Sequence, residues 1–250
     1  MAKTPSRIEE VYERLRSDLI SGAIMPGERL NTLRLAERFG MSQSVIREAL
    51  SRLTADGLTI TLHRRGFRAA PISVREMTQV ADALAEIEAI CLSRSMQAGG
   101  SVWVASVTAA HAAFADTPFH VEGEGPGVSE RFVEAYSRFR TALVSACDNE
   151  VLLRLRSQAL VLTERHSRIC AALGAKTGHL SEAYLPLMAA IAAGDEARAT
   201  ALLASQLRAN TVKLAEMYKA RLGWVDALDD ADAETAEPVN EHALKAVFAS

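Results

Sequence analysis

Residues 32–70 read TLRLAERFGMSQSVIREALSRLTADGLTITLHRRGFRAA, and this stretch decides the fold of the first part of the chain. Apolar residues recur at helical spacing in two segments, Thr32–Phe39 and Gln43–Asp56, which are separated at Gly40. The Ser42 side chain is placed to accept a backbone N–H at the start of the second segment. The residues expected to face inward are Leu33, Leu35, Ala36 and Phe39 in the first helix, and Val45, Ile46, Ala49, Leu50 and Leu53 in the second. Two short helices joined in this way are typical of a helix-turn-helix.

The flanking sequence extends this unit on both sides. Upstream, residues 8–21 carry a further helical pattern, which ends before a Pro-Gly turn at residues 26–27. Downstream, residues 58–62 alternate as a strand does, residues 63–66 form a basic turn, and residues 67–70 can return as a second strand. Three helices followed by a hairpin with a cationic tip predict a winged helix-turn-helix.

This arrangement suits DNA binding. The helix that starts at Gln43 would enter the major groove, where Gln43, Ser44 and Arg47 can reach base edges or phosphates. The arginines of the hairpin tip would lie along the backbone or in the minor groove. The alternative for Arg47 is a surface ion pair with its neighbour Glu48.

The ordered motifs of residues 15–67 resemble the GntR family of bacterial transcription regulators. They are the G-x-[IL]-x-PG turn from Gly22 to Gly27, the LAxxxGxS run from Leu35 to Ser42, the REAL segment at 47–50, and the Gly-Phe pair of the wing at 66–67. The resemblance places Ser42, Gln43, Ser44 and Arg47 on the DNA-reading positions, and Arg65 and Gly66 on the wing. The full set of expected DNA contacts is Arg34, Ser42, Gln43, Ser44, Arg47, His63, Arg64, Arg65 and Gly66.

Two positions depart from the pattern of that family. The family usually has Arg where Gln43 lies, and Thr-Pro where Ser44 and Val45 lie. Glutamine prefers adenine whereas arginine prefers guanine, so we expect an operator that differs from the usual family sequence.

Composition and charge set the wider limits. The chain has 250 residues, of which 49% are hydrophobic, 24% charged and 5% aromatic, as expected for a packed and mainly helical protein. Residues 1–71 carry 12 Lys/Arg against 8 Asp/Glu, whereas residues 222–250 carry 1 against 7. The charged N-terminal segment and the absence of a long apolar run predict a cytoplasmic protein without a membrane span. Cys91, Cys147 and Cys170 lie far apart and are expected to be buried thiols.

The remainder of the chain is predicted to be helical. We expect helices over 74–96, 102–114, 130–146, 150–173, 182–192 and 196–221. The helix order, together with ACDNEVLLRL at 146–155 and AAIAAGDEARATALLASQL at 189–207, resembles the FCD effector domain of the FadR subfamily. The expected domains are a winged helix at 1–71, a linker at 72–75, an FCD-like domain at 76–222 and an acidic tail at 223–250.

FCD domains typically bind a divalent metal through one Asp and three His. In this chain the four positions fall on Tyr136, Arg140, Tyr184 and Gln206, none of which is a good metal ligand, so no metal is expected. We hypothesise that Arg140 instead holds the carboxylate of an effector, with hydrogen bonds from the other three. The alternative is a filled cavity, with Arg140 pointing outward and the tyrosines serving as packing. Pro186 can start or kink its helix and so shift the position of Tyr184.

The sequence as a whole predicts a dimeric transcription regulator, most simply a repressor. It would bind a palindromic operator and be released by a small organic acid. The alternatives are a C-terminal domain that only dimerises, or an activator. No catalytic motif is visible, so we do not expect an enzyme. In the tail, residues 241–248 could form a helix that packs on the partner subunit, or could be disordered.

Overall fold

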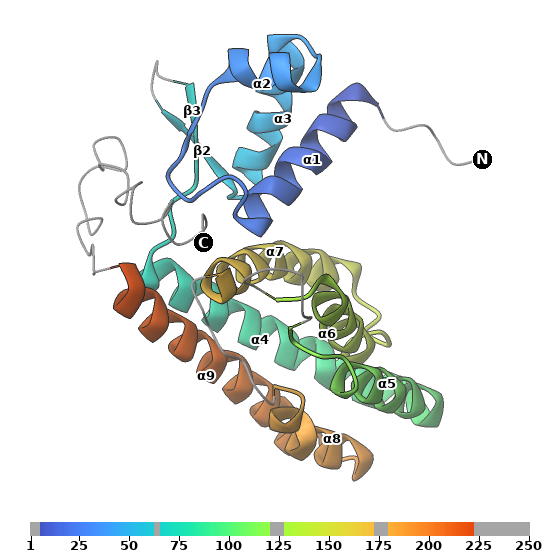
Figure 1. The fold of residues 1–250 in the computed structure, drawn as a ribbon. Coiled ribbons are helices and arrows are strands. Elements are labelled where there is room, and N and C mark those ends of the chain that lie inside the picture. Colours follow the sequence, from blue (N-terminus) through green and yellow to red (C-terminus); the bar gives the residue numbers. More distant parts are fainter. Residues whose placement is uncertain (1–5, 63–65, 121–127, 173–179, 223–250) are drawn as a thin grey trace.

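The computed structural model describes residues 6–62, 66–120, 128–172 and 180–222. They form an N-terminal unit of three helices and a small sheet, followed by an all-helical domain (Figure 1). This confirms the mainly helical fold class and the winged helix expected from the sequence. Most of the expected wing tip (residues 63–65), and the expected tail helix at 241–248, lie outside the described residues.

The N-terminal unit is built from short elements closed around one apolar core. Its sheet is antiparallel with strand order β1-β3-β2, and Arg29 pairs with Arg68 across β1 and β3. Strand β1 is not predicted from the sequence, because a strand of two residues has no alternation to detect. The elements are α1 (Arg7–Ser21), β1 (Arg29–Leu30), α2 (Thr32–Phe39), α3 (Gln43–Ala55), β2 (Thr59–Leu62) and β3 (Gly66–Ala69).

Local capping explains one wrong expectation within this unit. Leu33 was expected to face inward, but its side chain is 52% exposed. The Asn31 side chain accepts the backbone N–H groups of Leu33 and Arg34, which fixes both residues in the first turn of α2. The buried face of α2 therefore begins at Leu35 and continues with Ala36.

Gly66 has a structural reason to be glycine. Its φ of 90° lies in the left-handed region, where a side chain would strain the backbone, although a Cβ would find nothing within 4 Å. The backbone conformation is therefore a sufficient reason for a glycine at the start of β3, whether or not Gly66 also contacts DNA.

The helical domain begins directly after the sheet. The connection is short, because α4 starts at Val74. Residues 182–192 divide into a 3-10 turn and a helix, with Pro186 in the first turn of that helix. Within the described residues, no helix is long and apolar enough to cross a membrane. The elements are α4 (Val74–Ala98), α5 (Gly100–Ala115), α6 (Glu130–Leu143), α7 (Glu150–Ala172), the 3-10 turn (Glu182–Tyr184), α8 (Leu185–Ala192) and α9 (Glu196–Leu222).

Helix α7 contacts the core of the N-terminal unit as well as the helical domain to which it belongs. It lies beneath α1, on the side of the helical domain that faces the winged helix (Figure 1). Val161 and Leu162 of α7 pack against the core of the N-terminal unit. Ile169 and Cys170 pack instead into a small core shared with α4 and α9. All three cysteines are buried free thiols, as expected from the sequence.

A hydrogen bond between Tyr12 and Asp56 ties α1 to the end of α3. The Tyr12 hydroxyl donates to Asp56 Oδ2 at 2.7 Å, and Arg52 lies 4.4 Å from the centre of the Tyr12 ring. We predict that Y12F lowers the free energy of unfolding by about 1 kcal/mol, because the ring contact remains while the hydrogen bond is removed. Urea denaturation of both proteins measures this difference. An unchanged free energy would show that the bond contributes nothing.

Candidate DNA interface and effector cavity

The start of α3 presents an exposed polar surface. Ser42, Gln43, Ser44 and Arg47 are all exposed. Ser42 Oγ caps the helix by accepting the Val45 N–H at 3.5 Å, and it lies 2.8 Å from Ser44 Oγ. The cap thus satisfies one of the free backbone N–H groups at the start of α3.

Two arginines of the helix-turn-helix are available for a ligand. Arg34 on α2 and Arg47 on α3 are exposed, and among the described residues neither guanidinium has a hydrogen-bond or ion-pair partner. The alternative ion pair between Arg47 and Glu48 does not form in the described part of the chain. Exposed guanidiniums beside a helix N-terminus suit phosphate and base contacts. His63, Arg64 and Arg65 lie outside the described residues.

The helical domain contains a cavity of about 490 Å³ between α4, α6, α7 and α9. This is the size of a site for a small molecule. Much of its wall is apolar, as the side chains of Met77, Leu84, Phe132, Leu214 and Met217 show.

Three of the four positions singled out from the sequence line this cavity. They are Tyr136 and Arg140 on α6 and Gln206 on α9. Tyr184 does not line it, but the Tyr184 and Tyr136 hydroxyls are 2.7 Å apart. Burial raises the pKa of Tyr184 well above its usual value, so this phenol stays protonated. Gln206 donates to Asn210 on the same helix at 3.0 Å.

Arg140 is held in a buried charge cluster. Its side chain is buried rather than pointing outward, and its Nη2 donates to Glu88 Oε1 on α4. Arg156 of α7 places its Nε 3.1 Å from the same oxygen, and its Nη2 donates to the Arg140 carbonyl at 2.8 Å. Burial alone would lower the pKa of Arg140, but Glu88, Tyr136 and Tyr184 raise it, so the guanidinium is charged. One carboxylate and two guanidiniums leave one excess positive charge.

These residues do not fit the divalent metal of typical FCD domains. The four positions offer two phenols, an amide and a guanidinium, and the guanidinium would repel a cation. In the described part of the chain, no three His, Cys, Asp or Glu side chains are grouped as a metal site.

Glu88 and Arg156 were not among the site residues predicted from the sequence. A signal was present, since Glu88 lies between Leu84 and Leu92 on the apolar stripe of its helix, where a charged residue needs a buried partner. The partners of Glu88 could not be predicted, because Arg140 and Arg156 come from other helices, α6 and α7, which meet α4 only in the folded domain.

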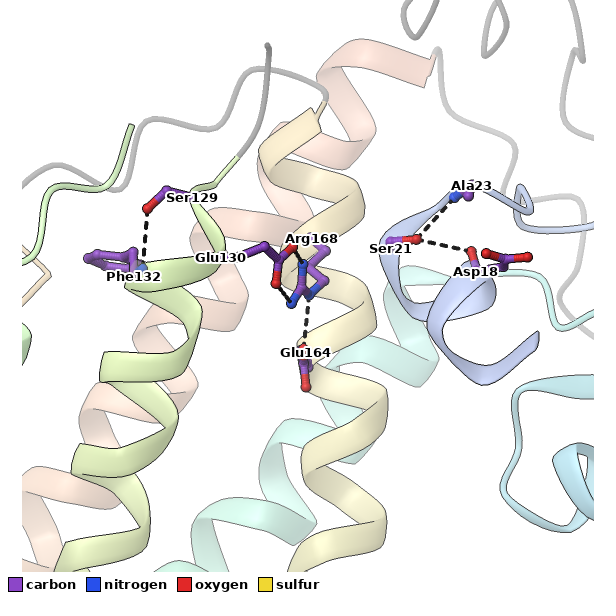
Figure 2. Close-up of polar contacts among 8 residues, drawn as sticks. All are labelled: Asp18, Ser21, Ala23, Ser129, Glu130, Phe132, Glu164 and Arg168. Atoms are coloured by element: carbon purple, nitrogen blue, oxygen red, sulfur yellow. Dashed lines mark hydrogen bonds and ion pairs between the residues drawn. The ribbon is translucent and has the colours of Figure 1, made fainter. Parts of the chain in front are cut away.

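A second group of charges links α6 to α7 at the edge of the cavity. Arg168 donates to both carboxylate oxygens of Glu130 at 2.5 and 2.8 Å, and to Glu164 at 2.9 Å (Figure 2). Ser129 caps α6 by accepting the Phe132 N–H at 3.2 Å. The start of α6 is therefore fixed on α7. Arg165 lies on the same helix, one turn before Arg168.

A winged helix with an exposed polar helix end, joined to a helical domain that contains a cavity, is typical of a DNA-binding transcription regulator. Comparison with known proteins agrees. Residues 7–68 match the family described as "Bacterial regulatory proteins, gntR family", and residues 79–209 match the FCD domain. The chain belongs to the gntR family, in the branch that carries an FCD domain.

Relatives with similar architecture have been named. The chain is 30% identical to BphR of Paraburkholderia xenovorans, an uncharacterised HTH-type transcriptional regulator, over 81% of this chain and 83% of that one. It is 30% identical to the transcriptional repressor GlaR of Escherichia coli over 78% of this chain and 90% of the relative. The solved structure of E. coli McbR/YncC covers 86% of this chain and 100% of its own, with a TM-score of 0.67 and 22% identity, so it supports the fold alone.

We predict that R47A weakens binding to a duplex selected by the wild-type protein from a random library. The loss expected for one bidentate base contact is about 1–3 kcal/mol, or roughly 5- to 150-fold in Kd. Fluorescence anisotropy measures it. The control is R52A on the same helix, because Arg52 pairs with Glu9 of α1 instead. Equal affinity of R47A and wild type would exclude Arg47 as a DNA-reading residue.

Proposed function

We propose that this regulator binds a palindromic operator as a homodimer and that a small organic acid in the cavity releases it. One winged helix reads one half-site, and two-fold pairing of subunits supplies affinity for a palindrome. Release would follow from a ligand that favours an arrangement of the two winged helices unable to span both half-sites. The name of the relative GlaR supports repression over activation.

The observation that carries the proposal is the excess positive charge in the wall of the cavity. Arg140 lines the cavity while bonded to Glu88, and its Nε has no hydrogen-bond partner among the described residues. A buried charge without full compensation is costly, so a carboxylate that enters the cavity gains a charge-assisted hydrogen bond. The hydroxyl of Tyr136 and the amide of Gln206 offer further polar contacts to the same ligand.

The rest of the wall indicates the body of that ligand. Beyond Arg140 and its polar neighbours, the apolar residues of α4 and α9 favour an alkyl or aryl group. His166 also lines the cavity, and burial with the neighbouring Arg165 lowers its pKa to about 4, so it adds no charge at neutral pH. Arg168 and Lys213 line the cavity as well, but Arg168 is paired with Glu130 and Glu164, and Lys213 is exposed. We therefore propose a carboxylate with an apolar body.

The alternative is an FCD domain that only dimerises. It requires a collapsed interior around these positions, and a cavity of about 490 Å³ argues against that. Thermal-shift measurements with octanoate, benzoate and 2-naphthoate, each with and without a chelator, test the choice. A concentration-dependent rise in Tm that survives chelation supports the acid sensor. No shift with any acid favours the dimerisation module, and a shift abolished by chelation means that a metal is required.

We predict that R140Q weakens binding of the acid that stabilises the wild type by roughly 10-fold or more, the value of a hydrogen bond to a charged group. The variant should still fold, because Arg156 remains to balance Glu88. Isothermal titration calorimetry measures the change. R138Q on the same helix is the control, since Arg138 is exposed and, within the described ranges, pairs with Glu134 alone. Wild-type affinity in R140Q would place the ligand elsewhere.

The wing carries a separate prediction. The double variant R64A/R65A should have a lower affinity for selected and unrelated duplexes alike, because Arg64 and Arg65 are expected to contact phosphates. The slope of log K against log salt should flatten by up to about 2, roughly one for each phosphate that the variant no longer neutralises. Anisotropy titrations across a salt series measure this slope. An unchanged slope would mean that the wing does not contact phosphate.

A further inference from the structure

Arg165 of α7 is a fully buried cation at the boundary between the two domains. Its Nε donates to the Leu19 carbonyl of α1 at 3.3 Å, and its Nη2 donates to the Ala70 carbonyl, directly after β3. One side chain of the helical domain thus holds two separate backbone segments of the winged helix.

In this contact a cation faces the negative end of a helix. A helix ends in unpaired carbonyls that carry partial negative charge, and the last turn of α1 contains no basic residue of its own. Arg165 supplies that cation from the other domain. Burial lowers its pKa to about 10, while Glu76 at the start of α4 acts to raise it, so the group is charged at neutral pH. Moving α1 away from α7 would separate this cation from the Leu19 carbonyl.

The cavity lies on another face of the same helix. Thr163 and Ser167, two residues on either side of Arg165 along the chain, line the cavity. Arg168, one turn further, bonds to Glu130 at the start of α6. A displacement of α7 by a ligand between α6 and α7 therefore has to move Arg165 relative to α1.

We propose that Arg165 is the positioning residue that couples the cavity to the DNA-binding domain, by fixing the end of α1 and the residue after β3 onto α7. This inference rests on the proposed function of the cavity. By linkage, coupling is reciprocal, so DNA binding must also change the cavity helices. That consequence can be measured without any effector.

The experiment is hydrogen–deuterium exchange on the full chain, with and without saturating DNA. The DNA is the duplex that the wild type selects from a random library. The proteins are wild type, R165Q and R165K, with R154Q as control, because Arg154 is an exposed arginine on the same helix. Lysine keeps the charge of Arg165 but cannot form the planar fork that reaches two carbonyls.

In wild type and R154Q, DNA should slow exchange in the cavity-facing segments of α6, α7 and α9 by roughly fivefold or more. In R165Q the effect should be confined to residues 6–70, and in R165K it should be reduced. If R165Q does not fold, the comparison of R165K with wild type tests the proposal. An equal effect in wild type and the folded Arg165 variants, or no effect beyond residue 70 in wild type, would overturn the proposal. The effector proposal would fail in a different measurement, the thermal-shift experiment, if no carboxylate raised the Tm of the wild type.

Discussion

The carboxylate of Glu88 has no exposed surface, and the helical domain is organised around the balance of its charge. A buried carboxylate is tolerated only with a close partner of opposite charge, and here α6 supplies Arg140 and α7 supplies Arg156 to the same oxygen. This requirement fixes three helices around one end of the cavity. It also leaves that end positive, since two guanidiniums meet one carboxylate.

The second constraint is that α7 is buried on several sides. Val161 and Leu162 pack against the winged helix, Ile169 and Cys170 pack with α4 and α9, and a further face lines the cavity. A helix of this kind cannot shift on one side alone, because packed interiors deform little. The domain that reads DNA and the domain with the cavity therefore share a structural element rather than a flexible tether.

The winged helix was readable from the sequence because its signals are local. Gly40 ends α2 in a left-handed conformation and Ser42 caps α3, and each acts within a few residues of its own position. The expectation for Leu33 was wrong because a cap, rather than periodicity, sets the first turn of α2. The charge cluster could not be predicted, since Glu88 and Arg140 are 52 positions apart in the sequence and meet only through packing. Periodicity shows that a residue is buried but does not identify its partner.

The guanidinium of Arg140 is covalently part of the chain, whereas the metal of a typical FCD domain is supplied by its surroundings. A bound ion can be diluted away, exchanged for another ion or removed by competing chelators in the cell. The positive charge in this cavity is present from the moment the helices pack. Under the proposed function, the response would depend on the abundance of the carboxylate alone, without a second dependence on the supply of a trace element.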